Sequence, residues 1–407
     1  GYTGSLGYVG SIGFTGSSGV ATPTSLGSVF GYTTGNGNIS LGCCSGNLTQ
    51  TGLNNIAIGC CSLFANTTGC NNIAIGQTAL CANTFGHNNI ALGCSALIAN
   101  TTGLCNIAIG TFALCATTVG FGNVAVGYGT LKANTIGNAN IALGACALFA
   151  STTACANIAI GYQALKTNTT GYNNIAIGCL TLCVNTIGNG NVAVGSRALT
   201  ANTTGCDNIA VGFQSLYGNV SGNNNIALGY GTLRSNTSGI VNIAISCYAM
   251  YCNTTGNHNV AIGFKALCAN ITGSCNIAIG PNALLGNPGG GNFNIAQGYG
   301  AMFSNNSGSC NIAIGYNALY CNTGGNGNIG LGRDALRCSQ TGSDSIAIGT
   351  CALGNTISSS NIALGYFSLY CDTTGVHNIA IGCCSLTKNT IGIDNTAIGR
   401  IALYCNT

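Results

Sequence analysis

The sequence is dominated by one short motif, Asn-Ile-Ala-Ile-Gly, that returns every 17 residues. Its first isoleucine stands at Ile56, Ile73 and Ile90, and the step of 17 continues to Ile277. A step of 18 then leads to Ile295, and a single step of 16 occurs near the end. Self-similarity at a fixed period is the signature of a solenoid, in which each repeat forms one coil and stacks on the next.

The consensus repeat reads I-A-I-G-x-x-A-L-x-x-N-T-T-G-x-x-N, and we number its positions 1 to 17. Positions 1 and 3 hold Ile, Val or Leu almost throughout, whereas position 2 is alanine in most copies, as at Ala57 and Ala74. Alternation with a period of two residues predicts a short strand. Because position 2 stays small, we expect both faces of this strand to be covered, with a close approach on the alanine side.

A second pattern spans positions 4 to 11. Position 4 is glycine in 21 of 22 copies, which indicates a backbone turn or a tight contact. The fixed positions 4, 7, 8 and 11 follow the spacing of a helical face, so we expect a helical segment of one to two turns. Its leucines, such as Leu63, Leu80 and Leu97, would anchor it to the core. The Asn-Thr-Thr-Gly that follows is typical of a turn.

These elements predict a repetitive β-solenoid of 22 coils over residues 39–407, each coil with one short parallel strand and a helical turn or second short strand. With about 4.8 Å between stacked strands, the array would be a rod on the order of 100 Å long. Each coil offers few large apolar side chains, so either stacked coils form one continuous core or several chains share it. The small residues at position 2 favour a homo-oligomer, and we expect a trimer.

The amino-terminal residues follow a different rule. Residues 1–19 carry glycine at every third position, which is the requirement of the collagen triple helix. The usual prolines are missing, so another glycine-packed assembly of polyproline-II type is the alternative. Residues 20–38 are expected to be a junction into the array. The chain has no signal peptide, does not begin with Met and stops within a repeat, and we interpret it as a segment of a longer or processed fibre protein.

Composition excludes several classes of protein. Charged residues make up 3% of the chain, nine Lys and Arg against five Asp and Glu, which is too few cations for a nucleic-acid surface. No apolar run approaches the roughly 18 residues of a membrane span. A disordered chain would be poorer in apolar residues than the 46% found here. Titratable groups are too few for an active site, so we expect no enzyme, cofactor, metal, nucleic-acid partner or membrane insertion.

The 26 cysteines all fall at repeat positions 5, 6, 9, 10, 15 or 16, outside the strand. So many thiols near the surface favour disulfides, and disulfides favour an extracellular or virion-surface setting. Metal binding is one alternative, although no Cys-x-x-Cys pair is present, and reduced inert thiols are another. The disulfide candidates are neighbours in adjacent coils or close pairs in the sequence: Cys43, Cys44, Cys60, Cys61, Cys179, Cys183, Cys247, Cys252, Cys321 and Cys338.

The remaining polar groups fit structural roles. We interpret the histidines and three of the acids as turn formers before a strand rather than catalytic groups. The asparagine at position 17, present in 21 of 22 copies, is expected to form a stacked ladder of hydrogen bonds inside the solenoid. The turn residues are at positions 15 and 16: His87, His258, His377, Asp207, Asp344 and Asp394.

Two patterns carry alternative hypotheses. Threonine at position 12 forms a row at coil spacing, and since ordered threonine rows organise water, an ice-binding face is a remote alternative. Asn-Thr-Thr is also an acceptor sequence for glycans in a secretory route, although the turn itself favours the same residues. The acceptors would be Asn66, Asn100, Asn168, Asn202 and Asn253.

The repeat Asn-Ile-Ala-Ile-Gly-x-x-Ala-Leu-x-x-Asn-Thr-Thr-Gly resembles the arrays of tail-fibre-like proteins of phages and giant viruses and of some bacterial surface proteins. Its Ala-Ile-Gly core is also similar to the shorter repeats in the heads of trimeric autotransporter adhesins. Residues 1–19 resemble the collagen-like stretches often joined to such fibres. The resemblance implies a fibrous, oligomeric, surface-exposed structural or adhesive protein, and it brings no catalytic residues.

We therefore expect a structural subunit of an extracellular or virion-surface fibre that self-assembles and is stabilised by disulfides. The alternative is an adhesin that contacts glycans or proteins of a host surface through positions 5, 6, 9 and 10. An adhesin should concentrate aromatic residues in a few coils, and their scatter along the sequence favours the fibre. The aromatic contacts would be Tyr162, Phe213, Tyr230, Tyr316, Tyr320, Tyr366 and Tyr370.

Overall fold

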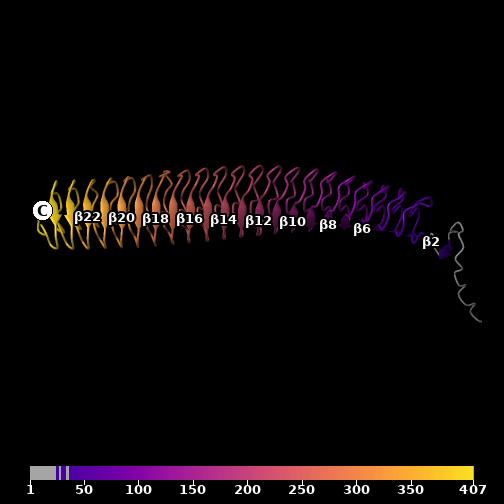
Figure 1. Ribbon diagram of the computed structural model, residues 1–407, viewed down its shortest axis with the longest axis horizontal. Helices are drawn as coiled ribbons and strands as arrows, with labels where there is room; N and C mark the ends of the chain where they lie inside the picture. The colour runs from indigo at the N-terminus through magenta and orange to yellow at the C-terminus, as the bar shows by residue number, and fades with distance from the viewer. Residues whose placement is uncertain (1–23, 27–28, 34–35, 407) are drawn as a thin grey trace, which may run out of the picture.

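The chain forms one long, gently curved rod of stacked coils (Figure 1). The computed structural model describes residues 24–26, 29–33 and 36–406. The stretch expected to be collagen-like, residues 1–19, and residues 20–23, 27–28 and 34–35 of the expected junction lie outside the described residues.

In the described residues, 24 short strands form a single sheet that runs the length of the rod. Strand β1 (Thr24–Leu26) pairs antiparallel with β2 (Val29–Thr33), and β2 pairs antiparallel with β3. From β3 onward every pairing is parallel. The strands of the coils are β3 (Ile39–Leu41), β4 (Ile56–Ile58), β5 (Ile73–Ile75), β6 (Ile90–Leu92), β7 (Ile107–Ile109), β8 (Val124–Val126), β9 (Ile141–Leu143), β10 (Ile158–Ile160), β11 (Ile175–Ile177), β12 (Val192–Val194), β13 (Ile209–Val211), β14 (Ile226–Leu228), β15 (Ile243–Ile245), β16 (Val260–Ile262), β17 (Ile277–Ile279), β18 (Ile295–Gln297), β19 (Ile312–Ile314), β20 (Ile329–Leu331), β21 (Ile346–Ile348), β22 (Ile362–Leu364), β23 (Ile379–Ile381) and β24 (Thr396–Ile398).

The strands stack in a register that aligns identical repeat positions. Ala159 of β10, for example, pairs with Ala176 of β11. The longer and the shorter coil keep this register, since β17 pairs with β18 and β21 with β22 through their equivalent residues. Their extra and missing residues fall in the turns. The parallel β-solenoid with coils of about 17 residues, predicted from the repeat, is confirmed.

Alanine and leucine line the inside of each coil. In the coil that begins with β10, Ala159 at position 2, Ala164 at position 7 and Leu165 at position 8 are all fully buried. The leucine anchors were therefore predicted correctly. A coil this small is filled by one large side chain, because protein interiors are close-packed, and this explains why position 2 stays small. The expectation that both faces of the strand are covered was wrong for the single chain, since only the alanine face is buried.

The helical segment expected at positions 4 to 11 is wrong, and no second strand occurs there in the described coils. The backbone is left-handed at positions 6 and 8, with φ of 55° at Cys61 and 49° at Leu63, which interrupts a right-handed helix. Most of the backbone hydrogen bonds of this segment run between coils, as from Leu63 N–H to the Ala79 carbonyl oxygen at 3.0 Å. Coils stacked about 4.8 Å apart leave no room for helices, which need about 8–10 Å. In the described part of the chain, no helix has the length and apolar character that crossing a membrane requires.

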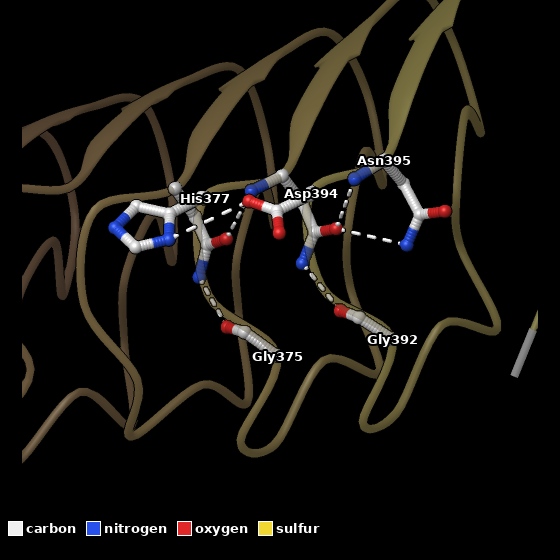
Figure 2. A network of polar contacts seen from close by, with 7 residues as sticks. Gly375, His377, Gly392, Asp394 and Asn395 are labelled. Atoms are coloured by element: carbon white, nitrogen blue, oxygen red, sulfur yellow. Dashed lines mark hydrogen bonds and ion pairs between the residues drawn. The ribbon is translucent and has the colours of Figure 1, made fainter.

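The position-17 asparagines form the predicted ladder. The Nδ2 of Asn72 donates to Oδ1 of Asn55 at 3.1 Å and to the carbonyl oxygen of Gly86 at 2.8 Å. The backbone N–H of Asn72 donates to the same Oδ1 at 2.9 Å. Figure 2 shows the ladder near the last coil, where Asn395 donates to the asparagine of the preceding coil and that asparagine donates to the carbonyl oxygen of Gly392.

The position-11 asparagines, which the sequence placed in a turn, form a second buried ladder. The Nδ2 of Asn83 donates to Oδ1 of Asn66 at 2.8 Å and to the Gly86 carbonyl oxygen at 3.1 Å. One glycine carbonyl at position 14 therefore accepts from both ladders. A Cβ atom at Gly86 would overlap the Oδ1 of Asn83. Each such bond contributes about 1 kcal/mol net, and the bonds recur along the rod.

Candidate interaction surface

Positions 1 and 3 of the 22 stacked strands β3 to β24 form a continuous stripe along the rod, which we call the Ile/Val strip. Their side chains point outward because position 2 points into the coil. They are more than one-third exposed at Ile75, Ile177 and Ile279, for example, at 39%, 37% and 37%. Of the 44 side chains at positions 1 and 3 of these described strands, only Gln297 and Thr396 are not Ile, Val or Leu.

The composition of the Ile/Val strip is unusual for a solvent-facing surface. The open face of a sheet that packs on one side normally carries polar residues in alternation with the buried ones. Isolated exposed apolar side chains are common, but a contiguous apolar patch marks an interaction site. The strip is such a patch, because successive strands place identical positions side by side. The sequence showed the alternation, but it could not tell which side of the strand faces the coil interior.

The predicted disulfide cysteines lie outside the coil core, as expected, and all are free thiols in this structure. Within the first two coils, the Sγ atoms of Cys43 and Cys44 lie 3.7 Å apart, and those of Cys60 and Cys61 lie 3.6 Å apart. The backbone N–H of Cys61 bonds to the Cys43 carbonyl oxygen at 2.9 Å, which brings the two pairs into adjacent coils.

The other candidate thiols are partly buried, apart from the exposed Cys179. Burial raises the pKa of the Cys183 thiol, and Cys179 adds to the rise. Cys247 and Cys252 occupy positions 5 and 10 of one coil. Cys321 and Cys338 share position 10 of adjacent coils. Burial raises the pKa of the Cys321 thiol, and its neighbour Cys338 raises it further.

The five asparagines that begin Asn-Thr-Thr sequences all belong to the second ladder. Each side chain is fully buried. In Asn202, for example, Nδ2 donates to Oδ1 of Asn185 and to the Gly205 carbonyl oxygen. Glycan attachment requires this nitrogen, so the hypothesis of glycosylation does not fit the folded coil. The same burial applies to Asn66, Asn100, Asn168, Asn202 and Asn253.

Aromatic side chains at positions 5 and 9 stack on one another from coil to coil. Phe213 stacks on Tyr230 with ring centroids 5.4 Å apart, and Tyr299 and Phe303 stack in the same way on Tyr316 and Tyr320. Near the end of the rod, Phe367 lies between two tyrosines. Of the aromatic residues named as adhesin contacts, these pairs involve Phe213, Tyr230, Tyr316, Tyr320, Tyr366 and Tyr370, whereas Tyr162 accepts a hydrogen bond from Gln163.

Sequence reasoning missed one aromatic cluster, which we call the Arg234 cluster. The guanidinium of Arg234 lies between the rings of Tyr217 and Tyr251, 5.3 and 5.5 Å from their centroids. Arg234 also donates to Oε1 of Gln214 at 3.1 Å and to the hydroxyl of Tyr251 at 3.1 Å. The signal was the recurrence of aromatic residues at positions 5, 6 and 9 of consecutive coils. The cluster comprises Phe213, Gln214, Tyr217, Tyr230, Arg234, Tyr248, Tyr251 and Phe264.

The threonine hydroxyls at position 12 form hydrogen bonds to the neighbouring coil. The hydroxyl of Thr84 donates to the carbonyl oxygen of Thr101 at 3.1 Å, and Thr101 donates to Thr118 in the same way. These hydroxyl protons are therefore used to join coils rather than to order surface water. The structure gives no support to an ice-binding face.

Charged groups are sparse along the described rod. The acids interpreted as turn formers have a left-handed backbone, with φ of 56° at Asp207 and 54° at Asp394. Asp394 lies 3.6 Å from Nδ1 of His377 in the turn of the preceding coil, and both side chains are exposed (Figure 2). No group of three or more His, Cys, Asp or Glu side chains that would hold a metal ion occurs in the residues that the structure describes.

Comparison of the chain with protein-family models, with curated proteins and with solved structures gives no match. The surface therefore has to be interpreted from its own chemistry. Its most extensive feature is the Ile/Val strip, and its most concentrated feature is the Arg234 cluster.

Proposed function

We propose that this chain is a structural subunit of an extracellular or virion-surface fibre, in which several copies pack through the Ile/Val strip. The observation that carries the proposal is the strip itself, an apolar stripe in which 42 of 44 positions hold Ile, Val or Leu. Aliphatic residues at nearly every position of an outer face are expected if that face is buried in an assembly. A trimer is the assembly that the resemblance of the repeat implies, and no catalytic role is proposed.

The size of the Ile/Val strip suits a stable interface. Strands stacked about 4.8 Å apart give it a length on the order of 100 Å, and strands of three residues give it a width of about 10 Å. Its footprint is therefore roughly 1,000 Å² on each copy, against about 800 Å² per partner in a standard protein–protein interface. The strip also lacks charged residues, so bringing copies together removes no ion from water.

Disulfides between neighbouring coils or neighbouring copies would strengthen such a fibre, and they are the reason for placing it outside the cell. Equivalent Cα atoms of adjacent coils lie about 4.8 Å apart, within the 4.4–6.8 Å range that a disulfide spans. Cys321 with Cys338 and Cys43 with Cys60 satisfy this condition by their repeat positions. Electrophoresis of the native assembly with and without reductant, after alkylation of free thiols, tests the proposal. If every thiol is alkylated before reduction, the assembly contains no disulfides, and the reason for placing it outside the cell is lost.

Self-association is tested by charging the Ile/Val strip. Lysine in place of Ile75, Ile177 and Ile279 should convert the assembly into monomers, measured by sedimentation velocity, because each substitution would bury an unpaired charge. The circular dichroism of the variant should match the wild type, since all three side chains point outward.

The matched control places lysine at three exposed isoleucines of position 13, outside the strip. These are Ile136, Ile187 and Ile391, with 49%, 52% and 66% exposure. The control should assemble like the wild type. A wild-type chain that is monomeric at micromolar concentration, or a strip variant that assembles normally, contradicts the proposed function.

The Arg234 cluster favours a second candidate, an adhesive role toward surface glycans or proteins. Aromatic and arginine side chains are the residues that concentrate binding energy at interfaces. A glycan array tests this with wild type and with Arg234→Ala. Binding that Arg234→Ala abolishes, and that Tyr172→Ala at an exposed tyrosine outside the cluster retains, would support adhesion. No binding by the wild type would contradict adhesion to glycans.

A further inference from the structure

We propose that the copies in the assembly lie parallel and in register, and that Gln297 specifies this alignment. The inference rests on the proposed function, in which copies pack through the Ile/Val strip. It goes further by naming the direction and the register of the partner, a second copy of this chain.

Gln297 interrupts an otherwise aliphatic surface. It occupies position 3 of β18, and its side chain is exposed. Its partners in the adjacent strands are Ile279 of β17 and Ile314 of β19, which are 37% and 39% exposed. From β3 to β23, every other position of the strip in the described strands holds Ile, Val or Leu. A glutamine in the middle of such a surface lies within any interface that covers it.

The primary amide of Gln297 makes the energy of the interface depend on alignment. A buried amide that finds no hydrogen-bond partner destabilises the state that buries it. When copies are parallel and in register, their Gln297 side chains meet at one level, where each amide is both donor and acceptor for another. A single polar residue in an apolar seam is a known device for fixing register and orientation.

Other alignments leave the amide without a partner. A shift by one coil, about 4.8 Å, sets Gln297 against the Ile279 or Ile314 level of the other copy. In a fully overlapping antiparallel pair, the order of strands β3 to β24 is reversed, so β18 faces β9. Gln297 would then lie against Ile141 and Leu143. The strip without Gln297 would be nearly uniform and would not distinguish these arrangements.

Photo-crosslinking tests the alignment in the full chain. Benzoylphenylalanine is placed at Ile314, which keeps Gln297 intact, and ¹⁵N-labelled and unlabelled chains are mixed before assembly so that links between copies are recognised by mass. The expected links join residue 314 to residues 295–331 of another copy. Links to the β8 level, residues 124–126, would show an antiparallel arrangement and overturn the inference, as would links spread over many coils.

A second variant tests the role of Gln297 itself. With Gln297→Ile in the same crosslinking chain, assembly should persist while the links spread over several coils. Gln340→Ile, a substitution of an exposed glutamine at position 12, should leave the links where they were. Unchanged links in Gln297→Ile would overturn the role of Gln297. A monomeric chain without links between copies would instead overturn the proposed function, so the two failures are distinguishable.

Discussion

Asn322 and Ser339 occupy the same position in adjacent coils, yet the Oδ1 atom of Asn322 and the Oγ atom of Ser339 are both buried without a hydrogen-bond partner. In most other coils this position carries the second asparagine ladder, in which Oδ1 accepts from the Nδ2 of the next coil, as Asn66 does from Asn83. Serine is too short to continue it. Asn134 and Ser151 form a similar break earlier in the rod.

Repairing this break should stabilise the rod. In Ser339→Asn, the new amide would donate to Oδ1 of Asn322 and to the Gly342 carbonyl oxygen, as other asparagines of the ladder do. Satisfying a buried acceptor is worth about 1–3 kcal/mol. Urea unfolding should shift to higher concentration, and hydrogen exchange should slow in the coils around residue 339. Ser307→Asn, on the exposed turn, should change neither, and equal stabilisation by both variants would contradict the ladder as the cause.

Much of this architecture was readable from the repeat. The parallel solenoid, its register, the leucine anchors and the position-17 ladder all followed from residue types that recur at fixed positions. The position-11 asparagines could not be assigned in the same way. An Asn-Thr-Thr-Gly sequence fits a turn as well as a ladder, and only the coil geometry brings Asn83 within reach of Asn66.

Two predictions, the helical segment and the covering of both strand faces in the single chain, were wrong for a common reason. A spacing of 4, 7, 8 and 11 is helical for an isolated segment, but stacking at about 4.8 Å forbids a helix and forces left-handed residues such as Leu63 into the coil. The same small cross-section puts alanine inside and isoleucine outside. Both errors came from treating one repeat by itself, whereas neighbouring coils decide its conformation.

A buried carboxyl should make one coil sensitive to pH. Asp372 takes the place of an asparagine in the second ladder and is fully buried. Its Oδ2 accepts from Ser358 Oγ at 2.8 Å and from Thr356 Oγ1 at 3.2 Å, and its Oδ1 accepts from Nδ2 of Asn389 at 3.0 Å. Burial raises the pKa of Asp372 above its ordinary value, and these hydrogen bonds oppose the rise without cancelling it.

A raised pKa means that the folded state favours the protonated carboxyl. Below the unfolded-state pKa both states are protonated and the group has no effect, whereas stability is lost as pH rises through the folded-state pKa. Asp372→Asn should therefore stabilise the chain at pH 7 and have little effect at pH 3. Thermal unfolding at several pH values measures this. If Asp372→Asn stabilises the chain equally at all pH values, the effect comes from the packing of the asparagine side chain and not from removal of the carboxylate charge.

The glycine at position 4 should be far less replaceable than a glycine two residues later in the same coil. Gly127 has a φ of 132°, and a Cβ there would lie 2.9 Å from the carbonyl carbon of Gly144. Gly129 at position 6 has a φ of 62°, and its Cβ would meet nothing closer than the Phe149 ring at 3.4 Å. Other coils carry non-glycine residues at position 6, as at Cys146 with a φ of 57°.

Gly127→Ala should therefore destabilise the rod by several kcal/mol, as for overpacking against a fixed backbone. Gly129→Ala should change stability by about 1 kcal/mol or less, since the loss of left-handed freedom is offset by a less flexible unfolded chain. Urea unfolding of the two variants measures the difference. Equal effects would mean that the coils move apart easily at position 4, contrary to the close contact described here.

The thiols should differ in reactivity according to burial. Burial raises the pKa of Cys268, and the neighbouring thiol of Cys252 raises it further, while Lys265 opposes the rise. The thiolate is the nucleophile. In the reduced chain at pH 8, iodoacetamide should therefore alkylate Cys268 several-fold more slowly than the exposed Cys105 and Cys310. Peptide mass spectrometry after short exposure to iodoacetamide measures each site.

The difference in alkylation rate should be present only in the folded chain. In guanidinium chloride, Cys268 should react at the rate of Cys105, because the protein no longer shields it. If Cys268 is alkylated slowly in both conditions, its neighbours in the sequence rather than the fold cause the low rate. A fast Cys268 in the folded chain would show that position 9 opens readily to solvent, and the partly buried cysteines would then be as available for cross-linking between copies as the exposed ones.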